Sequence, residues 1–154
     1  MTIQEFIKDF PLTYKVLDDY GKQVVKEIKA NLDNTGSNAT GTLKKSIQYD
    51  IIIGNLGPIV EFYMADYGKW VDEGRKPGGK MPPLKKILEW TSVRGIDSKY
   101  AFPIARKIAE DGIRPTNFFS IPTSQTEFEQ KKMNAKLEKA MVKDIENNLA
   151  KDFE

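Results

Sequence analysis

The residues best suited to chemistry in this chain lie in a glycine-rich segment. Residues 74–81 read Gly-Arg-Lys-Pro-Gly-Gly-Lys-Met and contain the Gly-x-x-x-x-Gly-Lys spacing of a phosphate-binding loop. In such a loop the next residue is a serine or threonine that holds magnesium, whereas here it is Met81. Pro82 and Pro83 also separate the segment from the helix whose first amides would face the phosphates. We therefore expect no nucleotide cofactor.

Two adjacent carboxylate pairs, Asp18-Asp19 and Asp72-Glu73, are the other candidates for chemistry. Neighbouring residues point in different directions on a helix or a strand, so neither pair predicts an acid–base couple. The chain has no histidine and no cysteine, which removes thiolate nucleophiles, disulfides and Cys/His zinc sites. We expect no enzyme activity, no catalytic residue, no metal site and no cofactor. A small hydrolase using carboxylates such as Asp72 stays as an alternative without a motif for its substrate.

The composition predicts a single soluble domain covering residues 1–154. The chain is 40% hydrophobic and 30% charged, which is typical of a globular protein. It contains no apolar run of about 18 residues, so we expect no membrane-spanning helix. The first residues lack the basic start and apolar run of a signal peptide.

Periodic patterns predict the elements that position these segments. Thr2-x-x-Glu5 is a capping box and Pro11 starts a second helix, whose apolar stripe is Leu17, Val24, Ile28 and Leu32. Residues 36–41 form a polar loop. Alternation at Ile47, Tyr49, Ile51 and Ile53 predicts a β-hairpin over about 46–66, with a further short strand at about 117–121.

Helices are expected on both sides of that last strand. Apolar spacing predicts helices over 84–93 and about 99–110, which together form a helical insert at about 82–112. A capping box at Ser124-x-x-Glu127 starts the final helix, with a stripe of Met133, Leu137, Met141, Ile145 and Leu149. The expected fold class is α+β, with a small antiparallel sheet packed by the N-terminal and C-terminal helices.

Two aromatic segments, 67–74 and 114–119, bracket the insert, and tryptophan and tyrosine are preferred anchors of subunit interfaces. The candidate interface residues are Tyr67, Trp70, Glu73, Gly74, Arg75, Lys76, Phe118 and Phe119. Residues 69–114 also hold eleven Lys/Arg against six Asp/Glu. The alternative function is therefore a DNA-binding module in which the insert acts as a helix-turn-helix. Its candidate nucleic-acid contacts are Lys76, Lys80, Arg106 and Lys107.

Three short motifs resemble those of the tail-component family of tailed bacteriophages. They are Gly41-x-Leu43-x-x-Ser46-Ile47, the segment Tyr67-Gly68-Lys69-Trp70-Val71-Asp72-Glu73-Gly74, and Arg114-Pro115-Thr116-Asn117-Phe118-Phe119 before the final helix. The family pattern begins a strand at the first motif, commonly has alanine at position 68 and glutamate at position 72, and has a smaller insert.

The resemblance implies a head–tail joining, neck or tail-completion protein of the virion. Its fold would be a small curved sheet packed by helices, with the 67–74 segment positioning the sheet edge. Six or twelve copies would close into a ring around the DNA channel through head-to-tail interfaces. The implied partners are the portal or connector, the tail proteins and the DNA in the channel, without a membrane. The implied location is the virion neck or tail, and the host cytoplasm during assembly.

Overall fold

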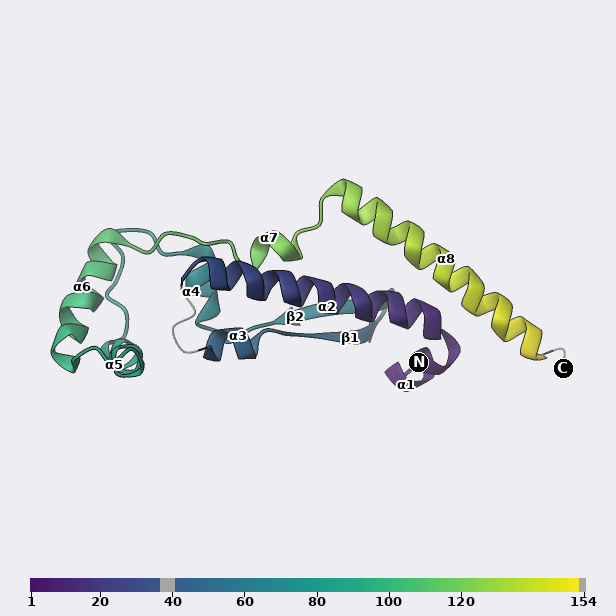
Figure 1. Cartoon of the computed structure of the whole chain (residues 1–154), viewed down its shortest axis with the longest axis horizontal. Helices are drawn as coiled ribbons and strands as arrows, with labels where there is room; N and C mark the ends of the chain where they lie inside the picture. The colour runs from purple at the N-terminus through teal and green to yellow at the C-terminus, as the bar shows by residue number, and fades with distance from the viewer. Residues whose placement is uncertain (37–40, 153–154) are drawn as a thin grey trace. The chain divides into compact units, whose positions relative to one another are not determined.

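A computed structural model of the chain describes residues 1–36 and 41–152, so most of the predicted polar loop lies outside the described residues. Figure 1 shows the elements in chain order: α1 (Ile3–Asp9), α2 (Pro11–Asn34), α3 (Thr42–Ser46), β1 (Gln48–Gly54), β2 (Gly57–Tyr63), α4 (Gly68–Glu73), α5 (Leu84–Val93), the 3₁₀ turn η1 (Ser98–Tyr100), α6 (Ala101–Asp111), α7 (Ser120–Thr123) and α8 (Glu127–Asp152). The α+β fold class is confirmed.

The chain divides into two compact units. Unit 1 comprises Met1–Glu27, Gln48–Tyr63 and Pro122–Glu154, and unit 2 comprises Ile28–Ile47 and Met64–Ile121. Helix α2 contributes residues to both units because it runs through the boundary at Glu27. The hairpin and α8 belong to unit 1, whereas the helical insert belongs to unit 2.

The predicted start of the chain is confirmed. The Thr2 hydroxyl accepts from the Glu5 amide at 3.2 Å, and the Glu5 carboxylate accepts from the Thr2 amide at 2.6 Å. Pro11 is the first residue of α2, and the helix ends before Gly36, which has a φ of 66°. The four apolar residues of the predicted stripe are all buried: Leu17, Val24, Ile28 and Leu32.

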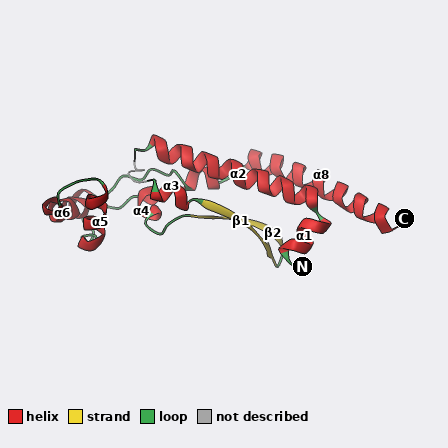
Figure 2. Ribbon diagram, turned by 60° about the horizontal axis from the view of Figure 1, so that its bottom comes forward, coloured by secondary structure: helices red, strands yellow, loops and turns green. Residues whose placement is uncertain are grey.

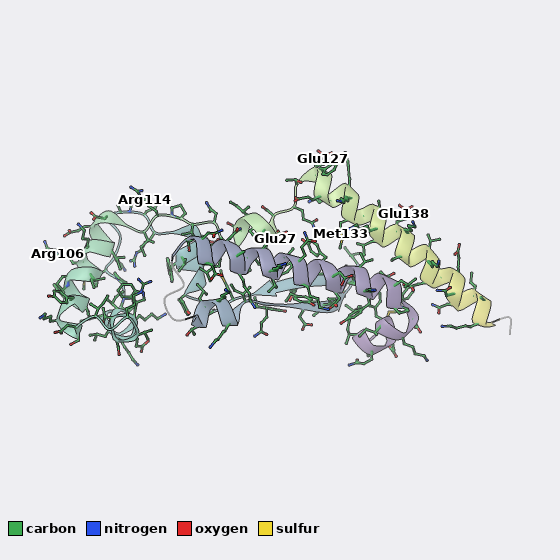
Figure 3. All side chains as sticks on the ribbon, viewed as in Figure 1. Glu27, Arg106, Arg114, Glu127, Met133 and Glu138 are labelled. Carbon is green, nitrogen blue, oxygen red and sulfur yellow. The ribbon has the colours of Figure 1, made fainter. Side chains whose placement is uncertain are left out.

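Strands β1 and β2 form an antiparallel hairpin, shown in yellow in Figure 2. Gly54 pairs with Gly57 across the turn, and Ile51 pairs with Val60. Ile51 packs in the core of unit 1 with Phe6 and Leu17. Helix α8 contributes Met133 and Leu137 to the edge of that core, and Figure 3 marks the position of Met133 on α8.

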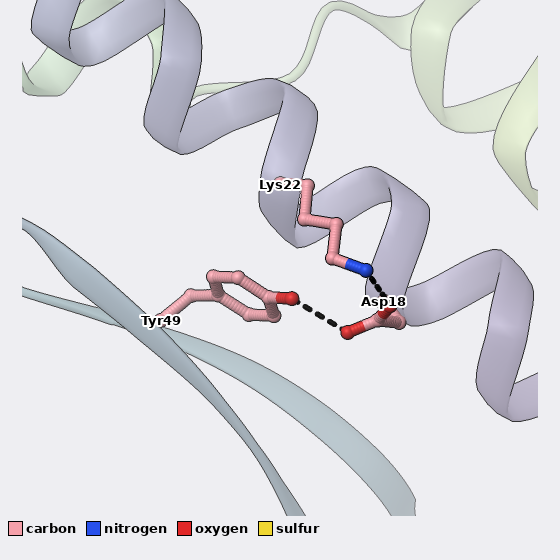
Figure 4. Close-up of polar contacts among 3 residues, drawn as sticks. All are labelled: Asp18, Lys22 and Tyr49. Carbon is pink, nitrogen blue, oxygen red and sulfur yellow. Dashed lines mark hydrogen bonds and ion pairs between the residues drawn. The ribbon is translucent and has the colours of Figure 1, made fainter.

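Tyr49 joins the hairpin to α2 (Figure 4). Its hydroxyl donates to Asp18 at 2.6 Å, and the Lys22 ammonium donates to the same carboxylate at 2.5 Å. The bonds from Lys22 and Tyr49 lower the pKa of Asp18, and burial together with the bond to Asp18 raises the pKa of Tyr49. Because the folded state favours ionised Asp18, this stabilisation is present at neutral pH and is lost as pH falls through the lowered pKa.

A buried aspartate of α8 caps the first turn of α2. Asp144, 1% exposed, accepts from the amide of Leu12 at 3.1 Å and from the amide and hydroxyl of Thr13, both at 2.8 Å. Those amides belong to the first turn of α2, where no carbonyl of the same helix can accept from them. One turn further along α8, Asn148 donates to the carbonyl of Asp9 at 2.6 Å. Two side chains of α8 therefore supply hydrogen-bond partners to the backbone groups at the junction of α1 and α2.

Residues 42–46 form α3, and the hairpin predicted over about 46–66 begins at Gln48. Two local predictions are wrong. The expected strand at 117–121 is absent, because the chain turns at Asn117, with a φ of 51°, and enters α7. The capping box of α8 is Thr126-x-x-Glu129, in which the Glu129 carboxylate accepts from the Thr126 amide at 2.8 Å.

The predicted apolar stripe of α8 is covered only at its start. Met133 and Leu137 pack on the core, whereas Met141, Ile145 and Leu149 are exposed. A spacing of four residues turns about 40° around the helix at each step, since one turn takes 3.6 residues. The second half of α8 therefore presents Asp144 and Asn148 to the rest of unit 1 in place of the stripe.

Replacing Asp144 by alanine is expected to lower the free energy of unfolding by about 2–4 kcal/mol, because the buried amide and hydroxyl of Thr13 and the partly buried amide of Leu12 lose their acceptor. Asp144→Asn keeps one acceptor oxygen and is expected to cost less. Urea denaturation followed by circular dichroism measures both. Glu146→Ala, an exposed change on the same helix, is the control. Equal stability of the Asp144→Ala and Glu146→Ala variants would contradict the role given to Asp144.

Gly21→Ala is expected to destabilise the protein, although alanine normally stabilises a helix by about 0.5–1 kcal/mol relative to glycine. A Cβ at Gly21 would lie 2.3 Å from Cδ2 of the Tyr49 ring. In a Tyr49→Ala background the ring is absent, so the same change is expected to be stabilising. Thermal denaturation of the four proteins of this double-mutant cycle measures the reversal of sign. A stabilising Gly21→Ala in the otherwise unchanged chain would show that the ring does not pack there.

Candidate interaction surface

The two aromatic segments lie side by side at the base of the helical insert. Arg75 and Ile113 form an antiparallel bridge, with N–H···O distances of 2.7 and 2.8 Å between their backbones. The bridge is flanked by Gly74 and Gly112, both with positive φ near 70°. A Cβ at Gly74 would lie 2.4 Å from the Ile113 carbonyl, and one at Gly112 would lie 2.2 Å from the Arg75 carbonyl. The two backbones can approach this closely only with glycine at both positions.

Asp72 holds the second segment against the first. Its side chain is 4% exposed, and its Oδ1 accepts from the amides of Phe119 and Ser120 at 2.8 and 3.1 Å. Its backbone carbonyl accepts from the amides of Thr116 and Asn117, both at 3.0 Å. The hydroxyl of Thr116 also donates to the Val71 carbonyl at 2.7 Å. Asp72 is therefore a buried structural acceptor, which explains why this carboxylate is neither solvated nor paired with Glu73 in an acid–base couple.

The segment that begins at Gly41 packs against the other end of α4. A Cβ at Gly68 would lie 2.8 Å from Cδ1 of Leu43 and 2.6 Å from Sδ of Met64. The Ser46 hydroxyl accepts from the amide of Ala65 at 2.9 Å. Glycine at position 68 thus allows α3 and α4 to approach closely. All three motifs quoted for the phage family meet around α4 within unit 2.

The aromatic residues of α4 face outward from this packed base. Tyr67 is 42% exposed and Trp70 is 53% exposed. The guanidinium of Arg75 lies 5.8 Å from the centre of the Trp70 ring, and Lys69 lies 4.0 Å from the Glu73 carboxylate. Partial burial raises the pKa of Tyr67. We call this set, Tyr67, Lys69, Trp70, Glu73 and Arg75, the α4 surface.

The remaining predicted interface residues divide into buried and exposed positions. Phe118 is 1% exposed and Gly74 is buried, so neither offers a side chain or surface to a partner. Phe119 is half-buried and contacts the Phe118 ring edge-on at 6.3 Å. Lys76 is exposed in the loop that follows the bridge. Nearby in sequence, Ile113 in a loop and Ile121 in the short helix α7 are also exposed. Neither was a predicted interface residue, because an isolated apolar residue carries no periodic signal.

The glycine-rich loop is tied to the insert rather than open to a phosphate. The amide of Gly78 donates to the carbonyl of Ala109 in α6 at 2.8 Å, and the Arg75 guanidinium donates to the carbonyl of Lys80. The loop leads to α5 only after the two prolines, as the sequence predicts. Within the described ranges, no three His, Cys, Asp or Glu side chains gather closely enough to hold a metal ion.

Of the predicted nucleic-acid contacts, the two on α6 each form an ion pair with a carboxylate of the same helix. Arg106 bonds to Glu110 at 2.8 Å and Lys107 to Asp111 at 3.1 Å, both one helical turn away. Figure 3 labels Arg106 on α6. Lys76 and Lys80 are exposed, and neither forms an ion pair with a carboxylate in the described part of the chain.

Neither a family model nor a curated protein nor a solved structure matches this chain. In the residues that the structure covers, no helix has both the length and the hydrophobicity needed to span a membrane. The function must therefore be argued from the α4 surface, from the short motifs that surround it and from the insert.

Asp72→Ala is expected to lower the free energy of unfolding by about 1–3 kcal/mol, since the change removes the buried carboxylate that accepts from the amides of Phe119 and Ser120. Glu73→Ala changes the neighbouring exposed carboxylate and is expected to shift stability by no more than about 0.5 kcal/mol. Urea denaturation measures both variants, and Asp72→Asn is expected to fall between them. If Asp72→Ala were no more destabilising than Glu73→Ala, Asp72 would not hold the two segments together.

Proposed function

We propose that this chain is a structural virion protein of a tailed bacteriophage, a ring-forming neck, head–tail connector or tail-completion subunit. The observation that carries the proposal is the meeting of the three resembling motifs around α4. Leu43 packs on Gly68, Asp72 binds the Phe119 amide, and all three belong to unit 2. Short motifs that match by chance have no reason to pack together, whereas motifs that build one surface must do so.

The α4 surface has the composition of a subunit interface. Interfaces place tryptophan and tyrosine at their centre, where a large ring is buried on association, and surround them with polar residues. Here Trp70 and Tyr67 are the exposed rings, and Lys69, Glu73 and Arg75 are their charged neighbours. Covering Trp70 would remove a large apolar side chain from water.

Other segments of unit 2 hold α4 in place, and this lowers the entropic cost of association through the α4 surface. The helix has only six residues, but α3 packs at one end and the Asp72 bonds hold the other. A surface that is already fixed before binding loses little conformational freedom when it is covered. We expect the same geometry in the free subunit and in the ring.

The charge distribution suits a head-to-tail ring. The residues of unit 1 include ten Lys/Arg and fourteen Asp/Glu, whereas those of unit 2 include fourteen Lys/Arg and eight Asp/Glu. A ring of identical subunits joins two different surfaces of neighbouring copies. Opposite net charges on different parts of each copy favour such heterologous contacts over contacts between like surfaces.

Quantitative mass spectrometry of purified particles from the phage that encodes this chain tests the proposal. The expected result is a fixed stoichiometry of six or twelve copies per particle, as the ring geometry requires. Absence of the chain from infectious particles would overturn the proposal. Particles assembled without the chain are expected to lack a joined head and tail and to recover on addition of the purified protein.

In that recovery assay, Trp70→Ala is expected to reduce head–tail joining by at least tenfold, because an anchor residue at an interface contributes about 2 kcal/mol or more. The variant is expected to keep its folded stability, since Trp70 is mostly exposed. Phe102→Ala removes another exposed aromatic residue of unit 2, 54% exposed on α6 and outside the α4 surface, and it is expected to join heads and tails normally. Equal activity of the two variants would remove Trp70 from the interface.

A further inference from the structure

The helical insert carries more basic than acidic residues. Residues 75–113 contain nine Lys/Arg and four Asp/Glu. Three of the four carboxylates, those of Asp97, Glu110 and Asp111, already form ion pairs with Lys99, Arg106 and Lys107. The remaining carboxylate, Glu89, is exposed on α5, and no ion pair forms in the described part of the chain at any of six cationic residues: Arg75, Lys76, Lys80, Lys85, Lys86 and Arg94.

These unneutralised cations lie on α5 and on the loop before it. Lys85 and Lys86 are exposed in the first turn of α5, and the described part of the chain offers neither of them a carboxylate partner. The opposite side of α5 is the packed one, since Thr91 is fully buried and α6 contributes the buried Ala101 and Ala105. The helix therefore divides into a packed side toward α6 and a basic exposed side.

An aromatic residue fixes one of these cations in place. The guanidinium of Arg94 lies 4.7 Å from the centre of the Trp90 ring. Lys86, Trp90 and Arg94 are spaced four residues apart and form one strip along the exposed side. A cation held over a ring loses less freedom on binding than one on a flexible chain.

We propose that this exposed side of α5, together with Lys76 and Lys80 of the preceding loop, binds the phosphate backbone of nucleic acid without sequence specificity. A row of unpaired cations on one helix face is complementary to a row of phosphates, and release of the condensed counterions drives the association. The face carries few amide or hydroxyl groups that could read base edges. The contact positions the backbone and does not select a sequence.

The proposed phosphate-binding face lies on α5 and not on α6, the helix that carries the predicted contacts Arg106 and Lys107. In a helix-turn-helix the second helix would enter the groove, and that helix here is α6. Its basic residues Arg106 and Lys107 form ion pairs with Glu110 and Asp111. The two carboxylates offset the positive charge of that helix and would repel phosphates. The inference is independent of the virion assignment, because it concerns the insert and not the α4 surface.

Fluorescence anisotropy with a labelled 20-base-pair duplex of random sequence, titrated with the full chain at several salt concentrations, tests the proposal. Lys85→Gln/Lys86→Gln is expected to weaken binding by about tenfold or more at 100 mM salt and to reduce the slope of log K against log salt by about 1.8. The matched control is Arg106→Gln/Lys107→Gln, which removes the same charge from α6 and is expected to change binding less than twofold. Circular dichroism confirms that both variants are folded.

Three results would overturn the proposal. They are undetectable duplex binding at 50 mM salt, equal losses in the two double variants, and equal affinity for poly-glutamate of matched charge. The last result would assign the face to an acidic protein surface. A chain that binds duplex but is absent from virions would leave this inference standing while removing the proposed virion role. A chain that is present in virions but does not bind duplex would remove this inference and leave the proposed virion role standing.

Discussion

The fold depends on buried carboxylates that accept hydrogen bonds from backbone amides at the starts of distant helices. The first amides of a helix have no acceptor within it, and burying them without one costs free energy. Asp144 satisfies the start of α2 from 131 residues away, and Asp72 satisfies the start of α7 from 47 residues away. The first bond closes unit 1 and the second closes the base of the insert in unit 2. Each unit therefore has a buried carboxylate that joins segments remote in sequence.

This arrangement links the interior to the surfaces proposed to function. Because Asp72 and the paired glycines at 74 and 112 fix the base of the insert, α4 can present Tyr67 and Trp70 without a large core behind them. The same base carries the insert, whose helices pack through small residues such as Ala101 and Ala105. Packing through small residues leaves the longer, charged side chains of α5 on the outside. The base of the insert thus supports two chemically different surfaces, an aromatic one that we propose binds a neighbouring subunit and a cationic one that we propose binds phosphates.

The sequence predicted most of the regular structure because those signals are local. The capping box at Thr2, the proline that starts α2, the helix over 84–93 and the alternation in β1 each depend on residues within a few positions of one another. The errors occur where a distant residue decides. Residues 117–121 have apolar residues suited to a strand, but Asp72 draws the Phe119 and Ser120 amides into the start of α7. The apolar stripe predicted on α8 packs on the core only at Met133 and Leu137, because Asp144 and Asn148 set which side of the second half of the helix docks.

The sequence by itself determined the α+β class, the absence of histidine and cysteine chemistry, the insert and the excess of basic residues within it. Those properties follow from composition and short-range periodicity, which need no knowledge of distant contacts. The ion pairs of Arg106 and Lys107 with Glu110 and Asp111 are also local, because the partners lie one helical turn apart on α6. Only the tertiary structure decided which remote segments meet, such as Asp72 with the amides of Phe119 and Ser120. Tertiary structure also decided that Phe118 is buried and Trp70 exposed, since burial depends on what packs against a residue and not on its type.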